Sequence, residues 1–169
     1  MGFEIDNTDF TEEDFNRFSD RLRSNLKALD ILLARPEFGE GDLSFGAELE
    51  LYIVDNEVRP LPINQEIIAQ LNDPQLTLEL NRYNLEYNFR PYLLKDCCFS
   101  ATQQEALAAI EKINKCAKQW DGSVVPIGIL PTLQQSDTGY HAMTPLARFK
   151  ALTQGLTEIR GGPFTIAIE

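Results

Sequence analysis

Apolar residues near the start of the chain recur at steps of three and four and predict an amphipathic helix over residues 11–34. Its apolar stripe consists of Phe15, Phe18, Leu22, Leu26, Leu29 and Leu33. Thr11 suits the N-cap position, and the acidic residues 12–14 complement the helix dipole in the first turn. Pro36 and Gly39 follow the pattern and are expected to end the helix.

The period then changes to two over residues 43–54, which is typical of a half-buried strand. One side of this strand is apolar and carries Ala47, Leu49, Leu51 and Ile53. The other side carries Gly46, Glu48, Glu50 and Tyr52. Residues 55–57 are expected to form a turn.

The rest of the chain mixes further helices and strands. The pattern predicts helices over 65–71, 100–119 and from Thr144 towards 156, and strands over 75–80, 84–89, 124–130 and 164–168. Thr144 and Pro145 have the order of an N-cap followed by an N1 proline. Because no regular βαβ alternation appears, the fold class is expected to be α+β. The sequence stops inside the last predicted strand, so we expect a truncated piece of a longer protein.

The charge and composition of the chain restrict the kinds of molecule that it is expected to bind. The formal net charge is −11, from 26 acidic and 15 basic residues, which opposes binding to nucleic acid or to anionic membranes. No apolar run approaches the roughly 20 residues of a membrane span, and the acidic N-terminus lacks the features of a signal peptide. Cys97, Cys98 and Cys116 have no metal-ligand spacing and fit reduced thiols. We therefore expect a cytoplasmic protein.

Several common catalytic motifs are missing from the sequence, namely the phosphate-binding GxxxxGK[ST], the dinucleotide glycine pattern, HExxH and GxSxG. His141 is the only histidine, which excludes a site with several histidine ligands. What remains is a set of carboxylates on predicted strands. Glu48 and Glu50 stand at i and i+2, about 7 Å apart along one face of a strand. Glu86 lies between Asn84 and Asn88 on a second strand of the same character.

Two interpretations of these carboxylates remain open at this point. Neighbouring carboxylates repel one another unless solvent or a cation intervenes, and Mg²⁺ commonly links carboxylates to nucleotide phosphates. The alternative is a solvated sheet face with ordinary polar residues. The face of the sheet on which Glu79 lies depends on the turn at residues 81–83, and the sequence pattern does not determine the conformation of that turn.

Four segments resemble the second family of glutamate–cysteine ligases, the bacterial carboxylate–amine ligases. The sequence SFGAELEL at residues 44–51 resembles the family's opening G-x-E-x-E strand, and Glu79 with Glu86 resembles its next acidic segment. Residues 127–132 are similar to the G-T-H-P stretch, with Leu130 in place of the histidine. Residues 143–149 are similar to the P-x-R-Y segment, with Phe149 in place of the tyrosine.

The resemblance implies a glutamine-synthetase-like, mainly antiparallel sheet with flanking helices, truncated at the C-terminus. Residues 1–40 would be an N-terminal helical segment, and residues 41–169 an incomplete catalytic domain. The implied reaction joins glutamate to cysteine through γ-glutamyl phosphate, with ATP as substrate and Mg²⁺ or Mn²⁺ as cofactor. Glu48, Glu50 and Glu86 would be metal ligands, and Arg148 would contact phosphate or a substrate carboxylate.

Three alternatives accompany this resemblance. The parent enzyme would be a ligase for a different amine, or the chain would be a non-catalytic binding or regulatory module of the same fold. Arg148 would, in the simplest case, be a surface residue of a helix. The fragment is expected to be inactive alone, and an open sheet edge would favour assembly into a homo-oligomer.

Overall fold

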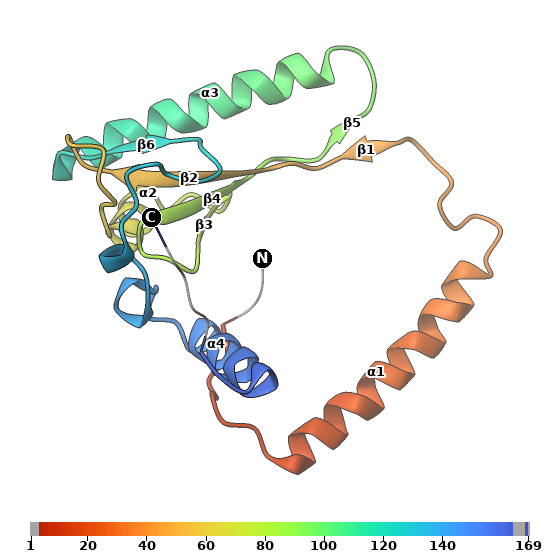
Figure 1. Ribbon diagram of the computed structural model, residues 1–169. Helices are drawn as coiled ribbons and strands as arrows, with labels where there is room; N and C mark the ends of the chain where they lie inside the picture. The colour runs from red at the N-terminus through yellow and green to blue at the C-terminus, as the bar shows by residue number, and fades with distance from the viewer. Residues whose placement is uncertain (1–3, 164–167, 169) are drawn as a thin grey trace.

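The computed structural model describes residues 4–163 and residue 168 and combines helices with antiparallel sheets (Figure 1). The helices are α1 (Glu12–Leu33), α2 (Asn64–Leu71), α3 (Cys98–Ala117) and α4 (Ala147–Arg160), with the short 3₁₀ turns η1 (Lys118–Trp120), η2 (Gln135–Asp137) and η3 (Tyr140–Ala142). The strands are β1 (Ser44–Phe45), β2 (Glu48–Val54), β3 (Leu76–Leu78), β4 (Asn84–Asn88), β5 (Tyr92–Leu93) and β6 (Ser123–Val125). The predicted α+β class is confirmed.

The main sheet has the strand order β3-β4-β2-β6, and every neighbouring pair is antiparallel. Strand β2 lies in the middle and pairs with β4 on one side and β6 on the other. Beyond a break at residues 46–47, the small antiparallel β1–β5 ladder extends the pair of β2 and β4. In β2, Leu51 and Ile53 are buried while Glu48 and Glu50 are exposed, as the alternating sequence pattern predicts.

The hydrophobic core lies between one face of this sheet and helices α2 and α3. It contains Leu51, Ile53, Ile67, Leu76, Leu85, Tyr87, Ala109, Ile113, Cys116, Ala117 and Val124. Figure 1 shows α3 along one side of the sheet and α4 on the opposite side. The polar face of β2 and β4 is therefore the one turned away from the core.

Most predicted boundaries differ from the structure by one or two residues, and three elements differ in a way that has a physical cause. The strand predicted over 43–54 is interrupted at Gly46 and Ala47. The strand predicted over 124–130 is wrong beyond Val125, because Pro126 has no N–H to continue the ladder. The N-cap of α4 is Leu146 and not Thr144, which is buried and bonded to other parts of the chain. Of the strand predicted over 164–168, residues 164–167 lie outside the described residues.

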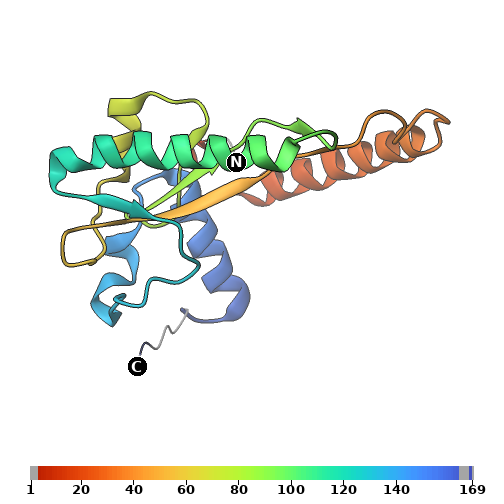
Figure 2. The same cartoon turned by 90° about the horizontal axis from the view of Figure 1, so that it is seen from above.

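Helix α1 forms where the pattern predicts it. Thr11 is its N-cap, and a capping box joins Thr11 to Asp14: the Asp14 N–H donates to Thr11 Oγ1 at 3.3 Å, and the Thr11 N–H donates to Asp14 Oδ2 at 2.9 Å. None of its residues is buried. Figures 1 and 2 show α1 projecting from the sheet and its helices, to which an extended segment connects it.

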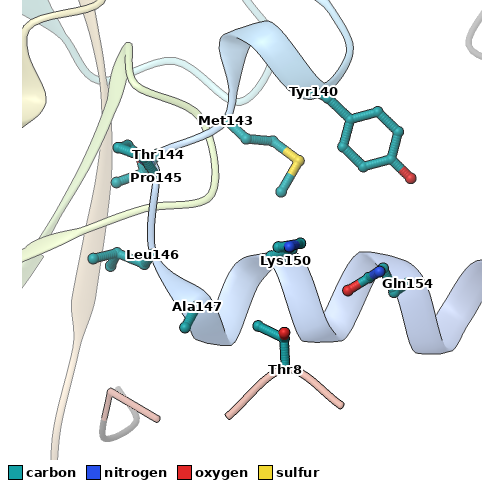
Figure 3. A pocket seen from close by; sticks show the side chains of 9 residues that line it. All are labelled: Thr8, Tyr140, Met143, Thr144, Pro145, Leu146, Ala147, Lys150 and Gln154. Atoms are coloured by element: carbon teal, nitrogen blue, oxygen red, sulfur yellow. The ribbon is translucent and has the colours of Figure 1, made fainter. Parts of the chain in front are cut away.

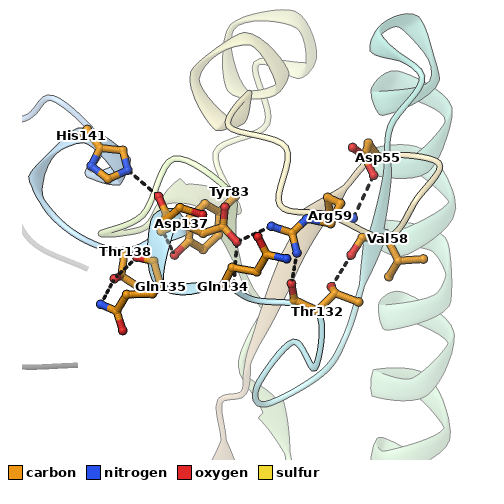
Figure 4. Close-up of polar contacts among 11 residues, drawn as sticks. Asp55, Val58, Arg59, Tyr83, Thr132, Gln134, Gln135, Asp137, Thr138 and His141 are labelled. Atoms are coloured by element: carbon orange, nitrogen blue, oxygen red, sulfur yellow. Dashed lines mark hydrogen bonds and ion pairs between the residues drawn. The ribbon is translucent and has the colours of Figure 1, made fainter. Parts of the chain in front are cut away.

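A network of polar contacts joins the long segment between β6 and α4 to the β2–α2 and β3–β4 connections (Figure 4). Arg59 pairs with Asp137 at 2.8 Å, Nη2 to Oδ2, and also donates to the Thr132 carbonyl. Tyr83 donates its hydroxyl hydrogen to the Asp137 carbonyl at 3.0 Å. The segment is thus fixed at its middle by residues from the β2–α2 and β3–β4 connections.

None of the helices in the described part of the chain combines the length and the apolar composition that crossing a bilayer requires.

Candidate functional site

The polar face of the main sheet carries its acidic residues in register. Glu50 of β2 lies directly opposite Glu86 of β4, and Glu86 lies directly opposite Thr77 of β3. Glu48 lies opposite Asn88 in the next row on the same face. Directly opposed residues have Cβ atoms about 5 Å apart, and diagonal neighbours are about 7–8 Å apart. The structure therefore brings the three predicted glutamates together on one surface.

Glu86 is held in place by its neighbours. Its side chain is 7% exposed, and Oε1 accepts hydrogen bonds from Thr77 Oγ1 at 3.1 Å and from Asn88 Nδ2 at 2.7 Å. Both donors approach the same oxygen. This arrangement fixes the orientation of the carboxylate on the sheet, as a site with a defined geometry requires.

Glu48 and Glu50 are exposed, unlike Glu86. Like charges directly opposite each other on a sheet repel, and a cation bound between Glu50 and Glu86 would weaken that repulsion.

Glu79 is the carboxylate whose position the sequence pattern does not fix, and it lies within the electrostatic reach of this pair. It is half-buried just after β3, and burial raises the pKa of its carboxyl above the usual value. The negative charges of Glu86 and then Glu50 raise the pKa of Glu79 further. Carboxylates close enough to raise the pKa of a neighbouring carboxyl, as they do for Glu79, are common on cation-binding surfaces.

The backbone at Glu79 is fixed by a buried polar network. Thr144 Oγ1 donates to the Glu79 carbonyl at 2.6 Å and accepts from Asn64 Nδ2 at 2.9 Å. Asn64 Nδ2 also donates to the carbonyls of Asn81 and Asn84, both at 3.2 Å. Asn64 and Thr144 are almost completely buried. The sequence pattern points to neither residue, because their partners are distant in the chain.

The donor set suits a hard cation, although it is not a closed metal cage. Within residues 4–163, no three aspartate, glutamate, histidine or cysteine side chains converge closely enough to enclose a metal ion. Mg²⁺ is usually held by one or two carboxylates together with water and substrate phosphates. Glu48, Glu50 and Glu86 offer carboxylate oxygens of the kind that such an open site uses.

Arg148 lies near the same edge of the sheet. It is on the first turn of α4, and its Nη2 donates to the Leu78 carbonyl of edge strand β3 at 3.3 Å. Its guanidinium carbon is 4.6 Å from the centre of the Phe149 ring, and Nε is 3.9 Å from Glu4 Oε2. Arg148 is therefore a half-buried residue that joins α4 to β3 rather than a surface residue free in solvent.

Two hollows lie close to these elements. One of about 490 Å³ is lined by Glu48, Asn88, Phe89 and the Gly46–Ala47 break, and so adjoins the carboxylate face. Another of about 560 Å³ lies along the first turns of α4 (Figure 3). Thr144 lines the second hollow, and its hydroxyl donates to the Glu79 carbonyl.

Comparison with known proteins identifies no relative: no family model matches the sequence, and neither a curated protein nor a solved structure is significantly similar to the chain.

Proposed function

We propose that this chain provides the metal and nucleotide platform of an ATP-dependent carboxylate–amine ligase that forms γ-glutamyl amides. The observation that carries the proposal is the direct opposition of Glu50 and Glu86 on adjacent antiparallel strands, with Glu48 diagonal to Glu86 on the same face. The resemblance of residues 44–51 and 79–88 to the glutamate–cysteine ligases supports it. The sheet would accordingly be of the glutamine-synthetase type.

In this proposal the residues of the chain hold and orient charge. Glu48, Glu50 and Glu86 bind Mg²⁺ or Mn²⁺, while Thr77 and Asn88 keep the Glu86 carboxylate in one orientation. The metal, when bound, offsets the negative charge of the transferring phosphoryl group. Arg148, which donates to the Leu78 carbonyl of β3, would attract an anion, either a phosphate or the substrate carboxylate.

Calorimetric titration of the chain with ATP, in the presence and absence of Mg²⁺, tests the platform. We expect Mg²⁺-dependent binding that the double variant Glu48→Gln, Glu50→Gln weakens at least about tenfold, since each carboxylate contributes a charged ligand. The matched control is Glu57→Gln, Glu111→Gln, which removes the same charge from exposed positions in the β2–α2 turn and on α3. Equal binding by both double variants would contradict the platform, as would no binding by the folded native chain.

Phosphate release tests the reaction class separately. The chain is supplied with ATP, Mg²⁺ and glutamate, and then with cysteine or one of a series of other small amines. We expect metal-dependent ATP binding without turnover, because the chain alone is expected to be inactive. Release that requires both glutamate and an amine would contradict that expectation, and the preferred amine would then identify the acceptor.

A further inference from the structure

One face of α1, extended by Phe10, is a continuous exposed apolar surface. Seven large side chains along it are between 43% and 66% exposed: Phe10, Phe15, Phe18, Leu22, Leu26, Leu29 and Leu33. They recur at the spacing of one helix face, and Phe10 extends the row by packing edge-on against Phe15, with ring centroids 6.3 Å apart. A helix of 22 residues with an apolar stripe and no buried residue is stable in water mainly when the stripe is covered.

The charges along α1 differ between its two ends. Residues 9–22 contain five acidic and two basic side chains, and residues 23–35 contain one acidic and three basic side chains. The first half therefore has a net charge of −3 and the second half +2. Two copies of α1 placed antiparallel bring opposite charges together, whereas parallel copies bring like charges together.

The area and shape of the surface also suit a second copy. Seven side chains of this size, each about half exposed, present on the order of 700 Å² per copy, so pairing would bury on the order of 1,400 Å². This is the size of a standard stable interface. A hollow of about 540 Å³, lined by Phe10, Phe15 and Phe18 among others, lies at the N-terminal end of the stripe. Antiparallel pairing would place the leucines from the C-terminal end of a second copy there.

We propose that α1 is a homodimerisation element, in which two copies of this chain pair their α1 stripes antiparallel, with the midpoint near residue 24. The partner is a second copy because the helix is complementary to itself in charge only in this orientation. The proposal concerns a surface distant from the carboxylates of β2 and β4 and does not depend on the proposed function.

Sedimentation velocity over a wide concentration range provides the test. We expect a monomer–dimer equilibrium whose dissociation constant rises at least about 100-fold in Leu22→Glu, Leu26→Glu. The control Ser24→Glu, Ala28→Glu adds the same charge at the same spacing on the opposite face of α1, and it should dimerise like the native chain. Fluorescence of Trp120, the single tryptophan, reports folding of the sheet domain independently of α1.

Disulfide cross-linking tests the orientation, in a background where the exposed Cys97 is replaced (Cys97→Ala). In the antiparallel pair, Asn25→Cys lies beside its own copy and should cross-link. Glu12→Cys would lie about 35 Å from its copy and should not. A native chain that stays monomeric, dimers that survive Leu22→Glu, Leu26→Glu, or cross-linking at residue 12 would each overturn the proposal.

Discussion

Asn64 donates a hydrogen bond of 2.9 Å to the hydroxyl of Thr144, a residue eighty positions later in the chain. The bond joins the first residue of α2 to the segment before α4, and the Thr144 hydroxyl in turn donates to the Glu79 carbonyl. Two buried polar side chains thus set the backbone position of a carboxylate in the candidate site.

Replacement of Asn64 by alanine should lower the free energy of unfolding by about 2–3 kcal/mol, because buried carbonyls lose their donor. Urea denaturation followed by Trp120 fluorescence measures this change. Gln70→Ala, an exposed change on the same helix, is the control and should have little effect. A double-mutant cycle with Thr144→Val should give a non-zero coupling energy; strictly additive effects would contradict the network.

Glu79 should make stability depend on pH in a defined direction. Because burial and then the charges of Glu86 and Glu50 raise its folded-state pKa, the folded chain holds the proton more tightly than the unfolded chain. This contribution to stability is complete below the ordinary value of 4.5 and is lost as pH rises through the folded-state pKa. In metal-free buffer, Glu79→Gln should therefore match the native chain in acid and exceed its stability at neutral pH. An advantage that is the same at every pH would contradict this assignment.

Glu105 should have the opposite pH dependence. Its side chain is 8% exposed, and although burial opposes ionisation, hydrogen bonds from Tyr92 at 2.5 Å and Gln75 at 2.8 Å lower the net pKa of Glu105. The stabilisation is present above 4.5 and disappears as pH falls through the folded-state pKa.

Glu105→Gln should consequently cost about 1–3 kcal/mol at neutral pH, with a difference from the native chain that shrinks in acid. Thermal denaturation across a pH series measures it. Glu111→Gln, exposed on the same helix, should leave the pH profile unchanged.

Arg59 should control how often the segment between β6 and α4 opens. Arg59→Gln removes the ion pair with Asp137 and weakens the bond to the Thr132 carbonyl. Amide hydrogen exchange of residues 131–141 should then rise at least about tenfold while the amides of β2 and β4 stay protected. Arg35→Gln, at an exposed position in the segment after α1, removes the same charge and should change neither region. Uniform acceleration across the sheet would instead indicate global destabilisation.

The sequence predicts elements well where local pattern and tertiary environment agree. The alternation of residues 48–54 follows from one face packing on α2 and α3 while the other stays polar, so the common face of Glu48 and Glu50 could be predicted. The register that sets Glu50 opposite Glu86 could not be predicted, because it joins two strands that α2 and β3 separate in the chain.

Long-range contacts account for what local pattern misses. Thr144 before Pro145 has the local pattern of a helix start, yet its hydroxyl is used by Asn64 and Glu79, and the helix begins after Leu146. Leu130 is buried as predicted for a strand, but in a non-repetitive segment held by Arg59 and its partners. Nothing in the neighbouring sequence marks Asn64, because all three of its acceptors come from later segments.

The position of β2 in the sheet has a consequence for folding kinetics. One edge of β2 pairs with β4. Its other edge pairs with β6, which lies much later in the chain, and Val54 is opposite Ser123 in that pairing. The first pairing closes a much shorter loop than the second, and long loops cost more chain entropy before their contacts form. We therefore expect the β2–β4 pairing to form early and the docking of β6, together with the end of α3, to complete the sheet late in folding.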